Sequence, residues 1–90
     1  MFARKLRVEI VVDGERRPCP LDWLDSFAMR RFTGEAAFDD TQPRGEGVLE
    51  AGFGVDAEKL AAEMGDWLTK KKGGGKRVAV EIRETERTAK

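Results

Sequence analysis

Two segments, one near each end of the chain, alternate between apolar and charged side chains, and this alternation limits the fold more than any other feature. In residues 6–12, one face carries Leu6, Val8, Ile10 and Val12. In residues 77–83, one face carries Val78, Val80 and Ile82, and the other carries Arg77, Ala79, Glu81 and Arg83. A strand with two such different faces buries one of them and leaves the other in water. The pattern therefore predicts a largely antiparallel sheet that helices cover on one side.

A β-hairpin is predicted directly after the first alternating segment. Asp13 and Gly14 favour a two-residue type I′ turn, because glycine tolerates the positive φ angles of that turn. The chain then returns through residues 15–17. Pro18 has no amide proton to donate to a neighbouring strand, so the returning strand ends there or lies at an edge of the sheet.

Two further segments have apolar residues at helical spacing. The first, residues 21–32, follows Pro20, which suits the first turn of a helix, and precedes Gly34, which suits a left-handed C-cap. The second begins behind Asp56, a good N-cap residue, and carries a long apolar stripe. Its last turn consists of lysines, whose charge suits the negative end of the helix dipole, and the triglycine at 73–75 stops it.

The stretch between the two helices is the least informative part of the sequence. We expect a short strand at residues 36–38, a turn or loop at 39–45 and another short strand at 48–53. Whether residues 35–54 form a hairpin or a loop stays open at this point. The order of elements is then β-β-α-(β-β)-α-β.

These elements predict one α+β domain, a two-layer sandwich in which a mostly antiparallel sheet of three to five strands carries two helices on one face. A chain of 90 residues can bury one modest core, so we expect no second domain. The domain is expected to span residues 1–84. Residues 85–90 are expected to form a frayed tail, because Ala89 is the only apolar residue there.

The charge of the chain indicates no particular class of partner. Seventeen Lys and Arg residues balance seventeen Asp and Glu residues, so a nucleic-acid or membrane-surface role would need a local basic patch. The single cysteine, Cys19, cannot form an intramolecular disulfide, which argues against the disulfide-stapled secreted class. No apolar run is long enough for a signal peptide or a membrane span. We therefore expect a soluble cytoplasmic protein without a membrane role.

The residue types that carry most enzymatic and metal chemistry are scarce. The chain has no His, and so lacks the usual general base and the commonest metal ligand. Cys19 lies just before the first predicted helix, where a thiol can be reactive, but without a histidine we expect a small buried side chain. The pairs Asp22 with Asp25 and Asp39 with Asp40 suit a helix N-terminus and a solvated turn better than acid–base catalysis. We predict no catalytic residue, no metal site and no cofactor.

The clearest candidate site is a basic segment at the end of the second predicted helix. It contains five cations and no acid: Lys70, Lys71, Lys72, Lys76 and Arg77. Such a cluster can bind the phosphates of a polyanion, although the same charges also suit the end of a helix. It is not a Walker-type phosphate loop, because there the glycine-rich turn precedes a helix, whereas here it follows one. The charged face of the sheet offers no aromatic residue on which a base would stack.

These observations favour a small non-catalytic binding or assembly module that acts through contact with a protein partner or with its own copy, as a homodimer. Two features suggest it: an edge strand at residues 15–18, and more aromatic side chains than a thin core can cover. Trp23 and Trp67 fall on the apolar stripes of the helices, so we expect both to pack in the core. The alternative is a nucleic-acid-associated protein that uses residues 70–77.

Overall fold

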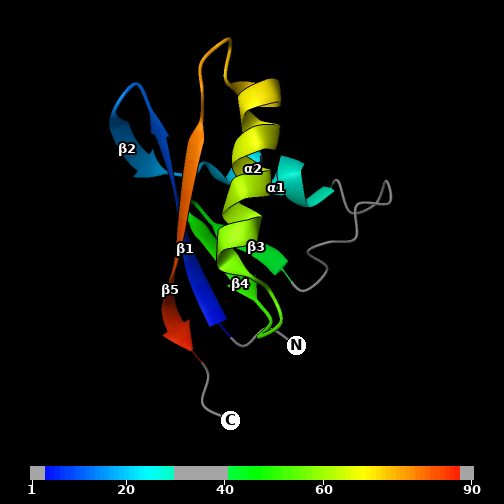
Figure 1. Ribbon diagram of the computed structural model, residues 1–90. Coiled ribbons are helices and arrows are strands. Elements are labelled where there is room, and N and C mark those ends of the chain that lie inside the picture. Colours follow the sequence, from blue (N-terminus) through cyan, green and yellow to red (C-terminus); the bar gives the residue numbers. More distant parts are fainter. Residues whose placement is uncertain (1–3, 30–40, 88–90) are drawn as a thin grey trace.

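The computed structural model describes residues 4–29 and 41–87, which form an α+β fold (Figure 1). The strands are β1 (Arg4–Val12), β2 (Glu15–Pro18), β3 (Thr41–Gly45), β4 (Val48–Ala51) and β5 (Ala79–Arg87), and the helices are α1 (Leu21–Ala28) and α2 (Ala57–Lys72). The predicted order β-β-α-(β-β)-α-β is confirmed. The segment between the helices contains an antiparallel hairpin, β3 with β4.

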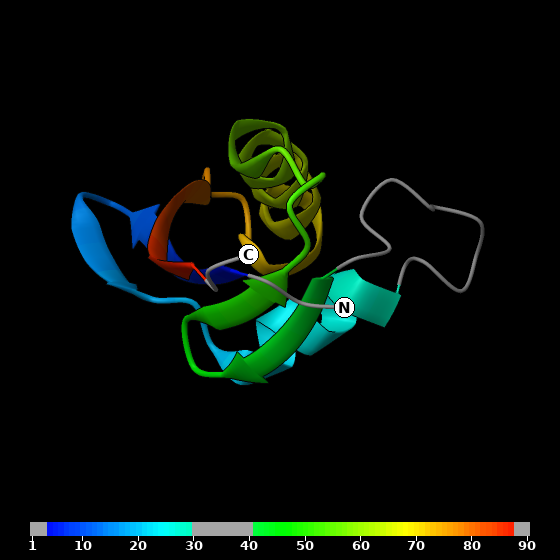
Figure 2. The same cartoon turned by 90° about the horizontal axis from the view of Figure 1, so that it is seen from below.

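β1 is the central strand of the sheet, and each of its neighbours runs antiparallel to it. β5 pairs with one edge of β1 along almost its whole length. The other edge is shared, because β4 pairs with the first half of β1 and β2 with the second half. β3 lies beyond β4. Seen from below, the sheet is curved rather than flat (Figure 2).

The change of neighbour along β1 occurs at Val8, where three backbone segments meet. The Val8 amide donates to the Gly47 carbonyl oxygen (2.8 Å), and the Val8 carbonyl oxygen accepts from the Cys19 amide (3.0 Å). The Gly47 amide in turn donates to the Cys19 carbonyl oxygen (2.7 Å). Gly47 has a φ of +70°, and a Cβ atom placed on it would lie 2.9 Å from Pro18 Cβ. The junction therefore needs a residue without a side chain.

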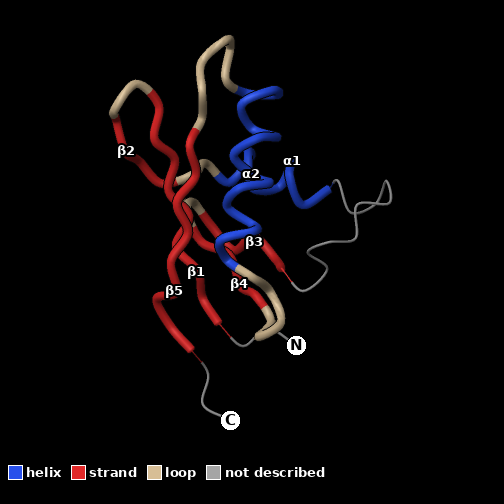
Figure 3. Tube along the Cα trace, viewed as in Figure 1, coloured by secondary structure: helices blue, strands red, loops and turns tan. Residues whose placement is uncertain are grey.

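The predicted phasing of the two long strands is confirmed. Ile10 lies opposite Val80 in the β1–β5 register, and both side chains point to the face that contains the core. The core comprises Leu6, Val8, Ile10, Cys19, Leu24, Phe27, Leu49, Ala51, Val55, Leu60, Met64, Leu68 and Val78. Both helices lie to one side of the β1–β5 pair (Figure 3). They meet where the Phe27 and Trp67 rings pack edge to face, with 5.8 Å between their centroids.

Local sequence explains where the helices begin and where α2 ends. α1 starts directly after Pro20, and α2 starts after Asp56, whose carboxylate accepts hydrogen bonds from two amides of the first turn. α2 ends at Lys72, and the chain then turns through Gly74 and Gly75, which have φ angles of +60° and +91°. The triglycine therefore stops α2 as the sequence predicts.

Several predicted boundaries differ from those of the structure. α1 ends at Ala28, not at residue 32, with Met29 as its C-cap. The predicted cap Gly34 and the predicted strand at 36–38 lie outside the described residues. β4 ends at Ala51 and is thus shorter than predicted.

The prediction of a loop over residues 39–45 is wrong for its second part, because Thr41–Gly45 is β3. Pro43 and Gly45 are typical of turns, but β3 has a neighbour on one side only, and an edge strand tolerates proline. The register shifts between Pro43 and Gly45, which accommodates the irregular sequence.

β5 also runs further than the sequence predicts. It continues to Arg87, three residues into the segment expected to be frayed, because Glu86 pairs with Lys5 and Arg87 with Arg4. No helix in the described part of the chain has the length and apolar character needed to cross a membrane.

Candidate functional site

The basic segment at residues 70–77 lies where α2 passes into β5. Lys70, Lys71 and Lys72 form the last turn of α2 and are exposed to solvent. Lys76 and Arg77 follow in the connection to β5 and are exposed as well. All five predicted cations are thus accessible at one end of the molecule.

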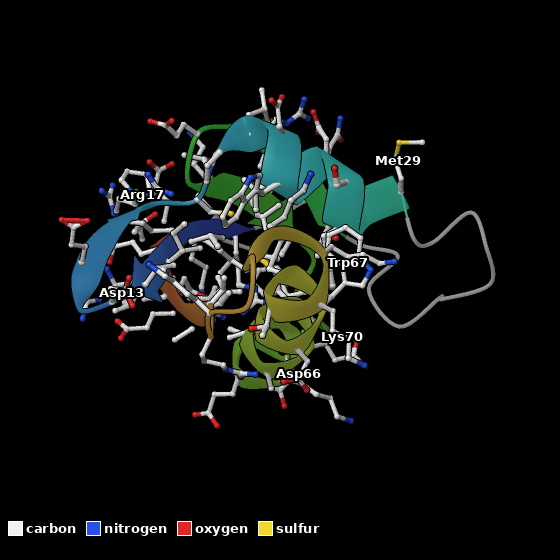
Figure 4. All side chains as sticks on the ribbon, turned by 90° about the horizontal axis from the view of Figure 1, so that it is seen from above. Asp13, Arg17, Met29, Asp66, Trp67 and Lys70 are labelled. Carbon is white, nitrogen blue, oxygen red and sulfur yellow. The ribbon has the colours of Figure 1, made fainter. Side chains whose placement is uncertain are left out.

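Two of the five cations, however, are paired with acids by the fold. Lys76 donates a hydrogen bond to Asp13 in the β1–β2 turn, and this bond raises the pKa of Lys76. Arg77 donates to Asp66 on α2 (3.0 Å). Figure 4 shows that Asp13 and Asp66 belong to different elements, so acids reach the segment from two sides. The cluster is therefore less positive than its sequence indicates.

Cys19 lies at the β1 junction and is fully buried. Burial raises the pKa of its thiol to about 12, and the nearby charge of Arg17 only partly opposes this effect. A thiol of this pKa is almost entirely protonated at neutral pH and makes a poor nucleophile. The position thus fits the interpretation of Cys19 as a small packing residue.

Of the two predicted acid pairs, the structure describes only Asp22 with Asp25. Asp22 and Asp25 are exposed on α1, and Asp22 lies in the first turn, where the helix dipole favours an acid. Asp39 and Asp40 lie outside the described residues. Within residues 4–29 and 41–87, no three His, Cys, Asp or Glu side chains are placed to hold a metal ion.

The open face of the sheet is charged and contains no stacking platform. None of the five strands contains an aromatic residue. Arg16 contacts both Glu9 and Glu81, which lie opposite each other in the β1–β5 register and would otherwise repel. Burial alone would raise the pKa of Glu9, but hydrogen bonds from Arg7 and Arg16 outweigh it and lower that pKa. In the described part of the chain, the Arg83 side chain makes no hydrogen bond or ion pair, and its cross-strand neighbour is Arg7, another cation.

A hollow of about 230 Å³ lies on α2, lined by Glu63, Asp66, Trp67 and Lys70. Figure 4 shows Trp67 and Lys70 on the same side of the helix. Acids and a base both line the hollow, so its charge selects neither an anion nor a cation. Trp67 and Trp23 are partly buried and pack against the core, as the sequence predicts.

Within residues 4–29 and 41–87, exposed apolar side chains are few and scattered. The large ones are Leu21, Met29 and Phe53. Leu21 and Met29 lie at opposite ends of α1, and the guanidinium of Arg87 covers the Phe53 ring at 5.1 Å from its centroid. Phe2, Phe32 and Phe38 lie outside the described residues, so the aromatic excess that the composition suggests stays a prediction.

Among the strands that the structure describes, three lie at edges of the sheet, because β2, β3 and β5 each have a single described neighbour. β2, which the sequence identified as an edge, has four residues and ends in Pro18. β3 is interrupted by Pro43 and by the register shift. β5 has nine residues and contains neither proline nor glycine. Short strands, prolines and bulges protect edges from pairing with other chains. β5 is neither short nor interrupted by proline, and its one irregularity, at Thr85, leaves residues 79–84 in regular pairing with β1.

The backbone groups that β5 presents at its free edge follow from the alternation of an antiparallel pair. Val8 directs its amide and carbonyl groups towards Gly47 and Cys19, so odd-numbered residues of β1 bond to β5. Their partners Ala79, Glu81 and Arg83 are odd-numbered as well. The even residues between and beside them, Val80, Ile82 and Glu84, therefore point their amide and carbonyl groups away from β1. These groups have no hydrogen-bond partner among the residues that the structure describes.

Comparison of the chain with protein-family models, with curated proteins and with solved structures found no match.

Proposed function

We propose that this protein is a non-catalytic binding or assembly module, and that it takes up an extended strand of another polypeptide along the free edge of β5. One observation carries the proposal: the outward amide and carbonyl groups of Val80, Ile82 and Glu84 have no partner in the described chain. Such a row of unpaired groups is a template for strand addition.

The side chains along this edge suit a partner strand as well as the backbone does. Val80 and Ile82 are half-buried against the core, so a partner strand would cover the remaining apolar surface of both. Glu81 and Arg83 are exposed on the opposite face of β5 and offer one charge of each sign. Main-chain hydrogen bonds would supply affinity and these side chains would supply selectivity.

The sequence favours β2 as the interaction edge, but β5 suits strand addition better. β2 is four residues long, and its last residue, Pro18, has no amide to donate. β5 offers a longer and more regular edge. The Arg16 side chain of β2 instead forms an ion pair with Glu81 of β5 across the open face of the sheet.

Residue-resolved amide hydrogen exchange tests the proposal. In the free monomer the amides of Glu81 and Arg83 should be protected, because they bond to β1, whereas those of Val80, Ile82 and Glu84 should exchange quickly. A synthetic peptide with the sequence of residues 4–12, the strand that β5 already accepts on its other edge, is a suitable probe.

Protection of the three even amides by this peptide, or by the chain itself at high concentration, is the expected result. A scrambled peptide of the same composition is the control and should protect none of them. If neither the probe nor a high chain concentration slows exchange at the even positions, strand addition at β5 is wrong.

A further inference from the structure

We infer that the strand that β5 accepts is β5 of a second copy of this chain, in an antiparallel two-fold register centred on Ile82. The inference rests on the proposed function and names its partner. Two copies of Ile82 would lie opposite each other, Val80 would lie opposite Glu84 of the second copy, and Glu81 would lie opposite Arg83 of the second copy.

The fold sets both ends of the available edge. Towards the start of β5, the Thr69 hydroxyl accepts a hydrogen bond from the Val78 amide (2.9 Å) and lies 3.2 Å from the Val78 carbonyl oxygen. The outward amide of Val78 thus already has a hydrogen-bond partner, the Thr69 side chain of α2. Towards the end of β5, the β1–β5 register shifts between Leu6 and Lys5, which leaves Thr85 as an extra residue. α2 also passes close to Val80, because a Cβ atom placed on Gly65 would lie 3.8 Å from the Val80 amide nitrogen, but this amide has no hydrogen-bond partner there. The window without hydrogen-bond partners therefore runs from residue 80 to residue 84, and Ile82 is its midpoint. Pairing centred on Ile82 requires each strand to turn away after the irregularity at Thr85, because Glu86 of the second copy would otherwise meet Thr69 beside Val78.

A pair of strands centred on that midpoint is complementary in hydrogen bonding. Val80, Ile82 and Glu84 all point their backbone groups outward, and in this register each of them faces another outward residue. A shift by one residue would place outward groups opposite inward groups and lose the ladder. The parity of the edge thus restricts a two-fold pairing to registers centred on a residue and excludes those centred between two residues. The neighbouring centres, Glu81 and Arg83, would each place a charge opposite its own copy.

The same register is complementary in charge. Glu81 and Arg83 flank Ile82 on the open face of the sheet, so the two-fold places each glutamate opposite an arginine, twice in the dimer. Within one copy, Arg83 has the cation Arg7 as its cross-strand neighbour and makes no side-chain ion pair in the described chain. A glutamate from a second copy would supply the missing counter-charge. The half-buried Ile82 side chains would meet on the opposite face.

Charge reversal tests the register directly. Glu81→Arg and Arg83→Glu each turn both cross-strand pairs from attractive to repulsive, so either change should weaken the dimer by about tenfold or more in sedimentation equilibrium. The double variant Glu81→Arg/Arg83→Glu restores both pairs with reversed polarity and should recover most of the wild-type affinity. The two single variants, mixed, should form a heterodimer more tightly than either associates with itself.

Three matched controls separate the register from other effects of charge. Glu46→Arg and Lys59→Glu make the same changes in net charge at exposed sites outside the strand, and should leave the dimer unchanged. Arg16→Gln removes the ion pair with Glu81 within one copy without altering β5, and should weaken the dimer far less than Glu81→Arg.

The outcomes distinguish this inference from the proposed function. Self-association that is insensitive to the single reversals, or that the double variant fails to recover, overturns the two-fold register, while strand addition at β5 can still stand. A chain that stays monomeric at high concentration but whose even amides are protected by the probe peptide also overturns the inference and keeps the proposed function. If the even amides are protected in neither experiment, both fail.

Discussion

Gly47 approaches Pro18 so closely that a methyl group on Gly47 would lie 2.9 Å from Pro18 Cβ. The same methyl group would lie 3.1 Å from the Val8 carbonyl oxygen. This contact holds β2, β4 and β1 together at the point where β1 changes its neighbour. The turn between β3 and β4 therefore helps to hold the sheet together through Gly47, although the neighbouring Glu46 is exposed.

Gly47→Ala should consequently destabilise the protein strongly. The φ of +70° is unfavourable for alanine by about 1–2 kcal/mol, and the displacement of Pro18 adds about 1–3 kcal/mol. Chemical denaturation of three alanine variants separates these effects. Gly14→Ala has a positive φ but open space around it, and should cost about 1 kcal/mol, whereas Gly45→Ala has neither problem and should cost close to zero. Similar losses for Gly47→Ala and Gly14→Ala would show that the close contact is unimportant.

The alternation of β1 and β5 predicts different costs for the two members of one cross-strand pair. Ile10 is fully buried and Val80 is half-buried, although they face each other. Ile10→Ala should cost about 2–4 kcal/mol and Val80→Ala about 1 kcal/mol, whereas Arg7→Ala on the open face should cost well under about 1 kcal/mol. Equal costs for Ile10→Ala and Arg7→Ala in urea unfolding would contradict the assignment of the buried face.

The central features of this fold are predictable because they are periodic. A period of two fixes which face of β1 and β5 is buried, and the helical stripe behind Asp56 fixes α2. The strand β3 is not predictable in the same way, because Pro43 and Gly45 indicate a turn unless one knows that the strand lies at an edge. The end of β5 looks like a charged tail until its pairing with Arg4 and Lys5 is known.

Roles that depend on distant partners are invisible in the sequence. The largely buried Arg4 side chain donates to the carbonyl oxygens of Gly52 and Val55, about fifty residues away, and lies 3.5 Å from Glu84. The acids that pair with Lys76 and Arg77 lie outside the basic segment, 63 residues away for Asp13 and 11 residues away for Asp66. A sequence shows that β5 is a strand, but only the topology shows that one of its edges is free.

Burial of Cys19 predicts slow thiol chemistry and a loss of stability in alkali. The unfolded chain ionises this thiol from about pH 9, its ordinary pKa, whereas the folded protein holds the proton up to about pH 12. Between these values the folded state therefore binds more protons than the unfolded state. The stability that the protonated thiol contributes is intact below pH 9 and is lost as the pH rises towards 12. Cys19→Ala should remove this part of the alkaline loss in pH-dependent unfolding, at a cost of about 1 kcal/mol at neutral pH. Rapid labelling of Cys19 by a thiol reagent under native conditions would contradict its burial.

The charges of the basic segment allow a prediction of how strongly the protein binds DNA or RNA, and this measurement separates assembly from nucleic-acid binding. A polyanion site would displace counterions from several cations, so its affinity would fall steeply as the salt concentration rises. Asp13 and Asp66 already pair with two of the five cations, and no described strand offers an aromatic residue for stacking. We therefore expect no DNA or RNA binding tighter than about 10 μM at physiological salt, which is the weak nonspecific range.

The double variant Lys71→Glu/Lys76→Glu should leave the fold and any self-association unchanged, because both depend on core packing and the β5 edge. A micromolar or tighter complex with DNA or RNA that weakens with salt and disappears in this variant would instead identify residues 70–77 as the functional site.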